Sequence, residues 1–393
     1  MIVLVLAAAA GAYPYVIYPA LLGIIAAVRR TRSAHDGRAP AARGAAWPLI
    51  SIQVPVYNEA AVIGRTLEAL LAADYPADRR QILVVSDASS DATDDIVRSF
   101  ADRGVELLRL PERRGKTAAE NAARRVLRGD IVINTDASVR VHPAAIRHLV
   151  AALAEEGVGL ASARDVSVAR LETLENAGEA AYVGFEMWLR DLETRVGGIV
   201  GASGCLYAIR SGLHFEYLPD SLSRDFAAAL VTRERGYRAV SVPEAICYVP
   251  RGVSLRQEYR RKVRTMTRGI ATLFYKRQLL NPVRFPETAW MLASHKLARW
   301  LMPWAAVVAL GALAVLAPEG RWAQAALAAA ALVLVLAALG WMWPDGRRIP
   351  RLLALPAFVV GGLVATLHAW LRVALRRHAP TWEPTRRAPA LER

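Results

Sequence analysis

Cysteine and lysine are scarce in this sequence, and several common ligand-binding motifs are missing. Its 393 residues include two cysteines, Cys205 and Cys247, too few for a disulfide framework or a cysteine metal cluster. They suit a reducing, cytoplasmic setting. No zinc-finger spacing and no arm rich in lysine or arginine occurs, which argues against a nucleic-acid partner. The G-x-G-x-x-G fingerprint is absent, which argues against a dinucleotide enzyme. Leu110 stands where the first glycine of a P-loop would be, so the segment around Lys116 is not a P-loop.

The charge balance is strongly basic, and almost all of the excess is arginine. Fifty Lys and Arg face 35 Asp and Glu, which gives a formal net charge of +15. Only four of the fifty are lysine: Lys116, Lys262, Lys276 and Lys296. Without a nucleic-acid motif, this surplus indicates anionic lipid or phosphorylated substrates as partners.

Four long stretches without charge interrupt the sequence, at residues 1–28, 300–317, 322–343 and 352–371. Each is close to the roughly 20 apolar residues that a bilayer crossing needs. The first stretch has no basic start and no clear cleavage site before Arg29, so it predicts a retained anchor and not a signal peptide. We therefore expect an integral membrane protein with a water-soluble middle.

The arginine-rich segments around these stretches predict their orientation. By the positive-inside rule, the segments 29–43 and 296–299 lie in the cytoplasm, and the turn at Pro318 lies outside. Arginines at 347–351 return the chain to the inside. The last stretch is basic at both ends, so the rule leaves its direction open. Four full crossings are expected, with a re-entrant bend at Gly361 and Gly362 as the alternative.

Between residues 48 and 168 the pattern alternates between strands and helices. Such alternation predicts a doubly wound, mostly parallel α/β sheet with right-handed crossovers. A basic helix is expected at 256–269, and an amphipathic stretch at 172–195 fits either a core helix or, as we favour, a helix on the membrane face. The expected strands are 49–57, 81–87, 105–110 and 131–133, and the expected helices are 60–73, 91–103 and 116–127.

These observations predict six parts along the chain. The first is a membrane helix, and a linker rich in Ala, Gly, Arg and Pro separates it from the α/β domain. Basic interfacial helices then lead to a region with about three further hydrophobic segments and to a basic tail. The predicted bounds are 1–28, 29–47, 48–250, 251–285, 286–375 and 376–393.

Polar side chains follow three of the expected strands. Tyr57, Asp87 and Asp136 would meet at the carboxyl edge of a parallel sheet, where open α/β sheets bind ligands. An aromatic ring and a carboxylate suit a nucleobase. A second carboxylate suits Mg²⁺ or Mn²⁺ with a diphosphate, because both ions prefer oxygen ligands. Taken alone, Asp136 would more often cap the next helix.

Two further charged residues allow two readings each. Lys116 at a predicted helix start suits a diphosphate contact, although such a lysine is more often a solvated charge. Asp225 lies in the first turn of a helix that begins after Ser223, where an acid commonly complements the helix dipole. The residues alone do not decide either case.

The order of these motifs, from about residue 49 to 264, resembles the membrane-bound family-2 glycosyltransferases, which have the GT-A fold. VPVYNEA, with Pro55, Tyr57 and Glu59, looks like the family's nucleotide-binding strand. VSDASSDAT looks like the family's D-G-S-x-D-x-T element, which implies that Asp87 is the acid that contacts uracil. GKTAAEN is similar to the segment that carries Lys116, and TDAS puts Asp136 in the place of the metal-binding D-x-D.

The later motifs of the resemblance concern the acceptor and the chemistry. SGCLYAIR, with Ser203, Gly204 and Cys205, resembles the acceptor-side loop. SRD falls where the family carries its catalytic base, which makes Asp225 that base. QEYRRK, with Gln257, Arg260 and Arg261, falls where cellulose and hyaluronan synthases carry the nucleotide-sugar-binding motif Q-x-x-R-W; these arginines also fit contacts with anionic lipid.

The resemblance implies an inverting, metal-dependent hexosyltransferase. It would move a hexose or N-acetylhexosamine from a UDP-sugar to a glycan or lipid-linked acceptor, with Mg²⁺ or Mn²⁺ on Asp136. Its partners would be the donor, the acceptor and membrane lipids, without nucleic acid. Its place would be a bacterial-type inner (plasma) membrane with the catalytic domain in the cytoplasm, serving cell-envelope or exopolysaccharide synthesis.

Three departures from the family pattern keep alternatives open. Ser138 replaces the second D-x-D carboxylate, Arg224 replaces the acid before the base, and Arg261 and Lys262 follow Arg260, so the tryptophan of Q-x-x-R-W is missing. The last departure removes the acceptor-stacking ring of processive synthases and favours a single-sugar transferase acting on a lipid carrier. A catalytically silent nucleotide-binding scaffold of an export complex is the alternative from another class.

Overall fold

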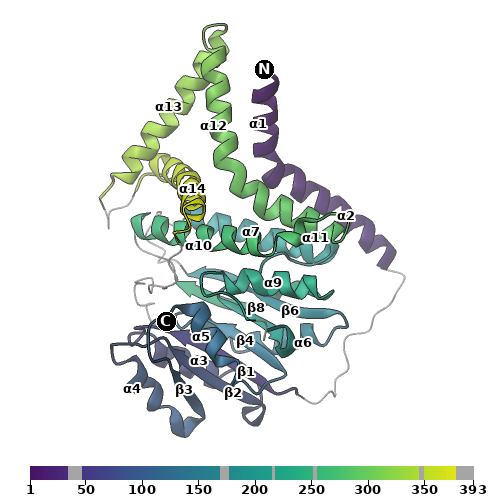
Figure 1. Cartoon of the computed structure of the whole chain (residues 1–393), viewed down its shortest axis with the longest axis vertical. Helices are drawn as coiled ribbons and strands as arrows, with labels where there is room; N and C mark the ends of the chain where they lie inside the picture. The colour runs from purple at the N-terminus through teal and green to yellow at the C-terminus, as the bar shows by residue number, and fades with distance from the viewer. Residues whose placement is uncertain (34–46, 169–176, 215–216, 251–254, 345–348, 378–393) are drawn as a thin grey trace. The chain divides into compact units, whose positions relative to one another are not determined.

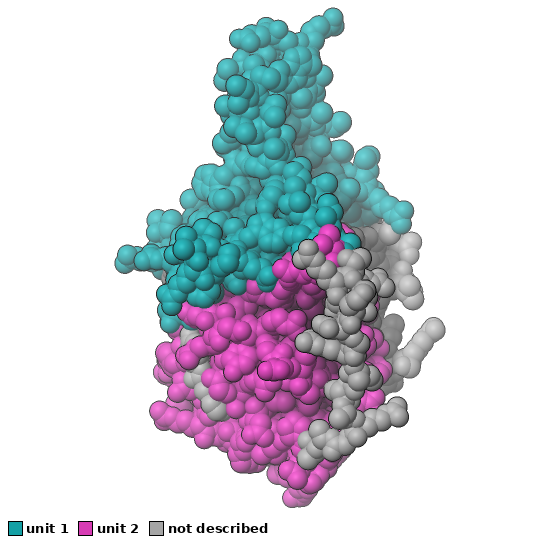
Figure 2. Space-filling view, turned by 90° about the vertical axis from the view of Figure 1, so that its right-hand side faces the viewer, with its two compact units in different colours: residues 1–27, 169–184, 251–378 teal, residues 28–168, 185–250, 379–393 magenta. Residues whose placement is uncertain are grey.

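The computed structural model describes residues 1–33, 47–168, 177–214, 217–250, 255–344 and 349–377. The chain divides into two compact units, which Figure 2 colours separately. Most of the predicted linker, residues 34–46, and most of the predicted tail, residues 378–393, lie outside the described residues. Unit 1 comprises residues 1–27, 169–184 and 251–378, and unit 2 comprises residues 28–168, 185–250 and 379–393.

Unit 2 is built on a mixed sheet in the order β3-β2-β1-β4-β7-β6-β8-β5 (Figure 1). The first four strands of this order are parallel, as the alternating pattern predicts, and β6 also pairs in parallel with β8. β7 runs antiparallel to both neighbours, and β5 is antiparallel to β8. The strands are β1 Ile50–Val56, β2 Arg80–Ser86, β3 Val105–Arg109, β4 Ile131–Thr135, β5 Arg140–Val141, β6 Val158–Val168, β7 Leu206–Arg210 and β8 Arg238–Pro250.

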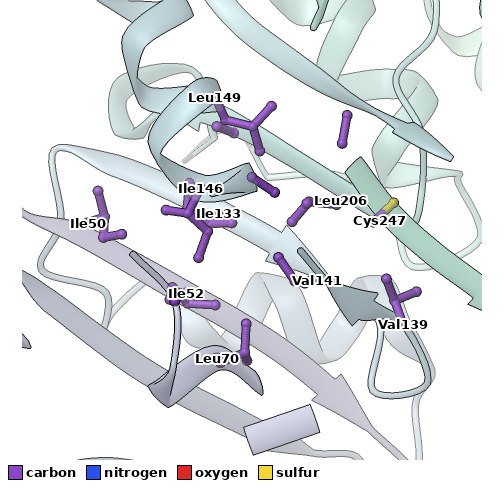
Figure 3. Packing of buried hydrophobic residues seen from close by; sticks show 14 of the residues in the cluster. Ile50, Ile52, Leu70, Ile133, Val139, Val141, Ile146, Leu149, Leu206 and Cys247 are labelled. Atoms are coloured by element: carbon purple, nitrogen blue, oxygen red, sulfur yellow. The ribbon is translucent and has the colours of Figure 1, made fainter. Parts of the chain in front are cut away.

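One face of the sheet packs against α3 (Ile63–Leu71) and α6 (Ala145–Leu153). Side chains alternate between the faces of a strand, so Ile50 and Ile52 of β1 point to this side together with Ile133 of β4. Leu70 and Ile146 of the two helices close over them (Figure 3). Complete burial of such side chains stabilises the fold by about 1.5–3 kcal/mol each.

The other face packs against α5 (Lys116–Ala123) and α9 (Arg224–Glu234). The contacting residues of these helices are small: Ala119 and Ala123 on α5, and Ala228 and Ala229 on α9. They lie against Leu83, Val85, Val132 and Tyr207 of the strands. Alanine lets a helix backbone approach the sheet closely, which brings the charged residues at the starts of α5 and α9 near its edge.

The remaining helices that belong wholly or partly to unit 2 include α4, α7 and α8. α4 (Thr93–Arg98) ends earlier than the predicted 91–103 helix, because the chain turns and reaches Gly104 in a left-handed conformation with φ 84°. α8 is Ser211–His214, and α7 (Ala177–Val196) corresponds to the predicted amphipathic stretch. In the part of α7 within unit 2, Met187 and Leu189 are buried and Trp188 is 49% exposed.

Unit 1 is helical and contains four stretches that are long and apolar enough to cross a membrane (Figure 1). They are Ile2–Arg29, Pro286–Leu316, Arg321–Trp341 and Arg351–Ala374, which confirms the four hydrophobic runs. The helices are α1 Ile2–Ala12, η1 Tyr13–Ile17, α2 Tyr18–Ser33, α10 Leu255–Tyr275, η5 Arg277–Leu280, α11 Pro286–Leu292, η6 Ala293–Leu297, α12 Ala298–Leu316, α13 Arg321–Trp341 and α14 Arg351–Ala374.

Two details of unit 1 bear on the predicted crossings. α14 continues unbroken through Gly361 and Gly362, so the alternative of a re-entrant bend is wrong for this segment. Glycine is tolerated in apolar helices, where neighbouring helices can pack closely on it. The first two candidate spans contact each other, since the hydroxyls of Tyr13 and Ser294 lie 2.7 Å apart and the ring of Tyr18 meets Trp290 edge-on.

Candidate active site

Three predicted site residues lie at one edge of the sheet of unit 2. Tyr57, Asp87 and Asp136 are each the first residue after a strand, β1, β2 and β4 respectively. These strands are neighbours and run in parallel, so their carboxyl ends share one edge. Ligands of open α/β sheets bind at this position.

The two loops that follow β1 and β2 are joined by several hydrogen bonds. The amide of Ser90 donates to the side-chain oxygen of Asn58 over 2.7 Å, and Asn58 itself has a left-handed φ of 51°. The amide of Glu59 donates to Thr93 Oγ1 over 2.9 Å, and that of Ala60 donates to Asp91 Oδ2 over 3.2 Å. The VPVYNEA and VSDASSDAT motifs therefore form one rigid surface.

Pro55 and Tyr57 occupy different environments in this surface. Pro55 is buried within β1 opposite Val85. Tyr57 is half-buried, and the guanidinium carbon of Arg113 lies 3.9 Å from the centre of its ring. A cation over an aromatic face is an attractive arrangement. The ring thus contacts the segment that leads into α5.

Asp87 fixes the start of α5. Its Oδ1 accepts the amide of Arg114 and its Oδ2 accepts the amide of Gly115, both over 2.7 Å. Gly115 caps α5 with φ 98°, a conformation that favours glycine. Only 3% of Asp87 is exposed, and hydrogen bonds to a buried carboxylate are strong. The carboxylate therefore determines where Lys116 begins the helix.

Lys116 and Asp136 form the central ion pair of the site. Lys116 Nζ lies 2.5 Å from Asp136 Oδ1 and 3.4 Å from the carbonyl oxygen of Gly204. Burial opposes the charged form of Lys116, but the negative charges of Asp136, Glu120 and Asp225 outweigh it and leave the lysine pKa raised. A permanent positive charge is therefore held beside the sheet edge.

Asp225 also lies close to Gly204. The hydroxyl of Ser223, which precedes α9, donates to Asp225 Oδ1. A Cβ atom added to Gly204 would be 2.7 Å from Asp225 Oδ2, so only glycine allows this close approach. Gly204 thus contacts Lys116 through its carbonyl group and Asp225 through its Cα.

The loop that carries Gly204 is held firmly on both sides. Ser203 donates through its hydroxyl to Asp165 Oδ1 over 2.6 Å and receives the amide of Cys205 over 3.1 Å. The carbonyl of Cys205 accepts the hydroxyl of Thr135 at the end of β4 over 3.0 Å. The predicted acceptor-side residues are therefore next to the predicted base.

Three predicted nucleotide-sugar residues lie in the other unit. Gln257, Arg260 and Arg261 are on α10 of unit 1. Arg261 donates to both carboxylate oxygens of Glu258, over 2.9 and 2.7 Å. Their contact with a nucleotide-sugar stays a prediction.

The donor set around Asp136 fits a divalent cation only in part. Within the described ranges, no group of three or more His, Cys, Asp or Glu residues is placed to hold a metal ion. Mg²⁺ and ions like it are often held by one or two carboxylates, with substrate phosphates and water as the other ligands. The single carboxylate of Asp136 meets that requirement if a diphosphate is bound too.

Two buried residues of this region were not predicted as functional. Glu120 lies on α5 four residues after Lys116, a spacing that puts both on one helix face. This spacing is the sequence signal that could have marked Glu120 as a site residue. Arg224 was noted only as a departure from the family pattern. They form an ion pair of 3.4 Å, and their side chains are 1% and 4% exposed. Burial raises the pKa of Glu120, although Lys116 and Arg224 oppose this effect.

The family model described as "Glycosyl transferase family 2" matches residues 51–184, which include the three strand ends and α5. This stretch is similar to a family 2 glycosyltransferase domain. It is also similar over 95% of its length to the structure of a mannosyltransferase, PcManGT from Pyrobaculum calidifontis, in complex with GDP-Man and Mn²⁺. The TM-score is 0.67, the identity is 24%, and 99% of that chain is covered. This likeness confirms the GT-A fold.

Curated relatives are similar to shorter parts of this chain. An N-acetylglucosaminyltransferase of Mesorhizobium japonicum is 29% identical over 241 residues, which cover 55% of this chain and 56% of that protein. A beta-monoglucosyldiacylglycerol synthase of Trichormus variabilis is 28% identical over 156 residues, 39% of this chain and 33% of that protein. The chain thus spans about half or less of the length of these two relatives.

Proposed function

We propose that this glycosyltransferase is an inverting membrane enzyme that transfers a hexose or N-acetylhexosamine from a UDP-sugar to a glycan or lipid-linked acceptor. One observation carries the proposal. Lys116 contacts both Asp136 and the Gly204 carbonyl, while the Cα of Gly204 lies against Asp225. A group for the donor diphosphate and a base for the acceptor are therefore neighbours within unit 2.

The donor would bind along the edge formed by β1, β2 and β4. Tyr57 offers an aromatic face to the uracil ring, and Asp87 offers a carboxylate at the same edge. Lys116 stands at the N-terminus of α5, where backbone N–H groups and the helix dipole favour phosphate oxygens. Its ammonium group would bind the diphosphate while Asp136 holds it in place.

The reaction would be a single displacement at the anomeric carbon of the sugar. The carboxylate of Asp225 would take the proton of the acceptor hydroxyl, and the acceptor oxygen would form a bond to that carbon. The bond between the carbon and the diphosphate oxygen would break at the same time, and UDP would leave with the electron pair. Attack from the face opposite the leaving group inverts the configuration.

Asp136 is the residue that would hold a divalent cation, in agreement with the D-x-S pattern at Ser138. A bound Mg²⁺ or Mn²⁺ supplies positive charge to the departing diphosphate. Lys116 supplies positive charge to the same group from the protein itself. Asp136 alone gives few protein ligands, so the diphosphate would complete the coordination.

A lipid-linked acceptor is the version that we favour over a long polysaccharide. The four apolar helices favour a membrane location, and Arg261 stands where processive synthases carry a stacking tryptophan. One relative is named for the synthesis of a glycolipid. We propose a plasma-membrane location with the catalytic domain in the cytoplasm, where UDP-sugars are found. The missing tryptophan and the glycolipid-synthase relative support single-sugar transfer over polymerisation.

Purified full-length protein tests the proposal directly. It would be incubated in lipid nanodiscs with radiolabelled UDP-glucose, UDP-N-acetylglucosamine or GDP-mannose, and the products separated by chain length and by lipid extraction. We expect one UDP-sugar to label a lipid fraction with a single sugar. An Asp225→Asn sample is the matched control. Binding of UDP without transfer from any donor would instead favour the nucleotide-binding scaffold.

A further inference from the structure

Arg224 directly precedes the proposed base, and it is buried although it is an arginine. It is 4% exposed, and its Nε lies 3.4 Å from Oε2 of Glu120, which is 1% exposed. A buried charge is costly unless an opposite charge and hydrogen bonds compensate it. Arg224 therefore has a defined partner on a different helix.

The hydrogen bonds of Arg224 tie the start of α9 to its surroundings. Its Nη1 donates to the carbonyl of His214 over 3.1 Å, and its Nη2 donates to Oδ1 of Asn121. Asn121 lies next to Glu120 on α5. A guanidinium group that bonds to three separate groups has its position fixed, and Asp225 is the adjacent residue in the same helical turn.

α5 also holds the segment that leads into α9. The hydroxyl of Thr117 donates to the carbonyl of Leu222 over 2.9 Å, and the side-chain amide of Asn121 donates to the carbonyl of Leu218 over 2.6 Å. The helix that begins with Lys116 thus supports the proposed base through a second set of side chains. Glu120 is four residues after Lys116 on α5 and pairs with Arg224.

We propose that Glu120 and Arg224 are positioning residues for glycosyl transfer, which set the carboxylate of Asp225 against Gly204. This inference rests on the proposed role of Asp225 as the base. Positioning matters because a displacement of about 1 Å at a reacting group can cost about 10²-fold in rate.

A double variant separates positioning from stability. Glu120→Gln leaves the buried Arg224 without the carboxylate it pairs with, and Arg224→Met leaves Glu120 with Lys116 as its remaining cation, so each is expected to lower the melting temperature. Glu120→Gln/Arg224→Met removes both charges, which relieves that penalty. The double variant should melt near the wild type, and its kcat should be lower by about 10- to 100-fold. Its donor KM and its Kd for UDP should change by less than about twofold.

Conservative and remote variants complete the design. Arg224→Lys keeps the charge and should retain more of kcat than Arg224→Met. Glu155→Gln/Arg238→Met removes an exposed ion pair of the same unit and should leave kcat unchanged. A double variant at Glu120 and Arg224 that melts normally and transfers at the wild-type rate overturns the proposal. One that fails to fold assigns the pair to stability and overturns it too.

Asp225→Asn in the same series distinguishes the two levels of inference. If Asp225→Asn keeps its transfer rate, the proposed base is wrong. If Asp225→Asn loses transfer and the folded double variant keeps it, the base stands and only the positioning role fails. If both lose kcat and keep UDP affinity, both proposals are supported.

Discussion

Lys116 and Asp136 meet at 2.5 Å, although one begins α5 and the other follows β4. The lysine charge is therefore balanced by a carboxylate from the protein itself. A diphosphate bound as proposed would meet a cation whose position is already set by Asp136 and the Gly204 carbonyl. Such preorganisation lowers the reorganisation needed during catalysis.

Lys116→Met should weaken UDP binding at every pH between 6 and 9. The pKa of Lys116 is raised above its usual value of 10.5. The contribution of its positive charge to the stability of the folded protein is therefore fully present below that pH. It is lost only as the pH rises through the still higher folded-state pKa. The difference in melting temperature between wild type and Lys116→Met should therefore be constant from pH 6 to 9. A difference that shrinks across this range would show that the lysine titrates there.

UDP and the divalent cation should bind cooperatively, because each completes the ligands of the other. Titration calorimetry of UDP with and without Mn²⁺ measures this coupling. Asp136→Asn should abolish the difference between the two titrations. If the wild type binds UDP equally well in both conditions, the assignment of a metal to Asp136 is wrong.

Asp225→Asn should lower transfer by about 10²–10⁴-fold, which is the usual contribution of a general base. The amide keeps the shape of the side chain but does not accept a proton at neutral pH. UDP affinity should stay within about twofold, since the base faces the acceptor. The measurement is sugar transfer and UDP binding on the same sample, and a folded variant with most of its transfer rate would contradict the assignment.

Gly204→Ala should reduce transfer by about 10²-fold without unfolding the protein. The new methyl group would be 2.7 Å from Asp225 Oδ2, so the carboxylate would have to move. Gly212→Ala is the matched control, because a Cβ at that position meets nothing within 4 Å. Equal transfer rates for the two variants would show that the site tolerates movement of Asp225.

Asp87→Asn should weaken UDP binding by about 10- to 100-fold, as expected for loss of a charged hydrogen bond worth about 1.5–3 kcal/mol. It should also lower the melting temperature, because both oxygens of Asp87 accept backbone amides at the start of α5. Asp102→Asn, at an exposed acid, should change neither quantity. If Asp87→Asn has normal stability and weaker UDP binding, Asp87 contributes to nucleotide binding and not to the stability of the start of α5.

Much of the fold follows from local sequence patterns. The β-branched strand at Ile131–Ile133 and the apolar runs of unit 1 lie where the patterns predicted them. The direction of β7 was not predicted. Leu206–Arg210 reads as a buried strand either way, since a buried strand shows the same apolar residues whether it is parallel or antiparallel.

The site was predictable where a residue follows a strand directly and less so where tertiary packing decides. Tyr57, Asp87 and Asp136 could be placed at one edge because strand ends share an edge. The contact of Lys116 with Asp136 depends on how closely α5 packs on the sheet. The burial of Arg224 depends on Glu120 from another helix, and neither fact is visible in a local pattern.

The lengths of the first two candidate spans have a geometric consequence. Ile2–Arg29 has 28 residues and Pro286–Leu316 has 31. At about 1.5 Å per residue they measure roughly 42 and 46 Å, whereas the hydrocarbon core of a bilayer is about 30 Å thick. A straight helix of either length that crossed the bilayer would tilt or extend into the headgroup layer. His295 and Arg299 lie in the first half of the second span and are 0% and 9% exposed, so other side chains of unit 1, and not lipid, surround them.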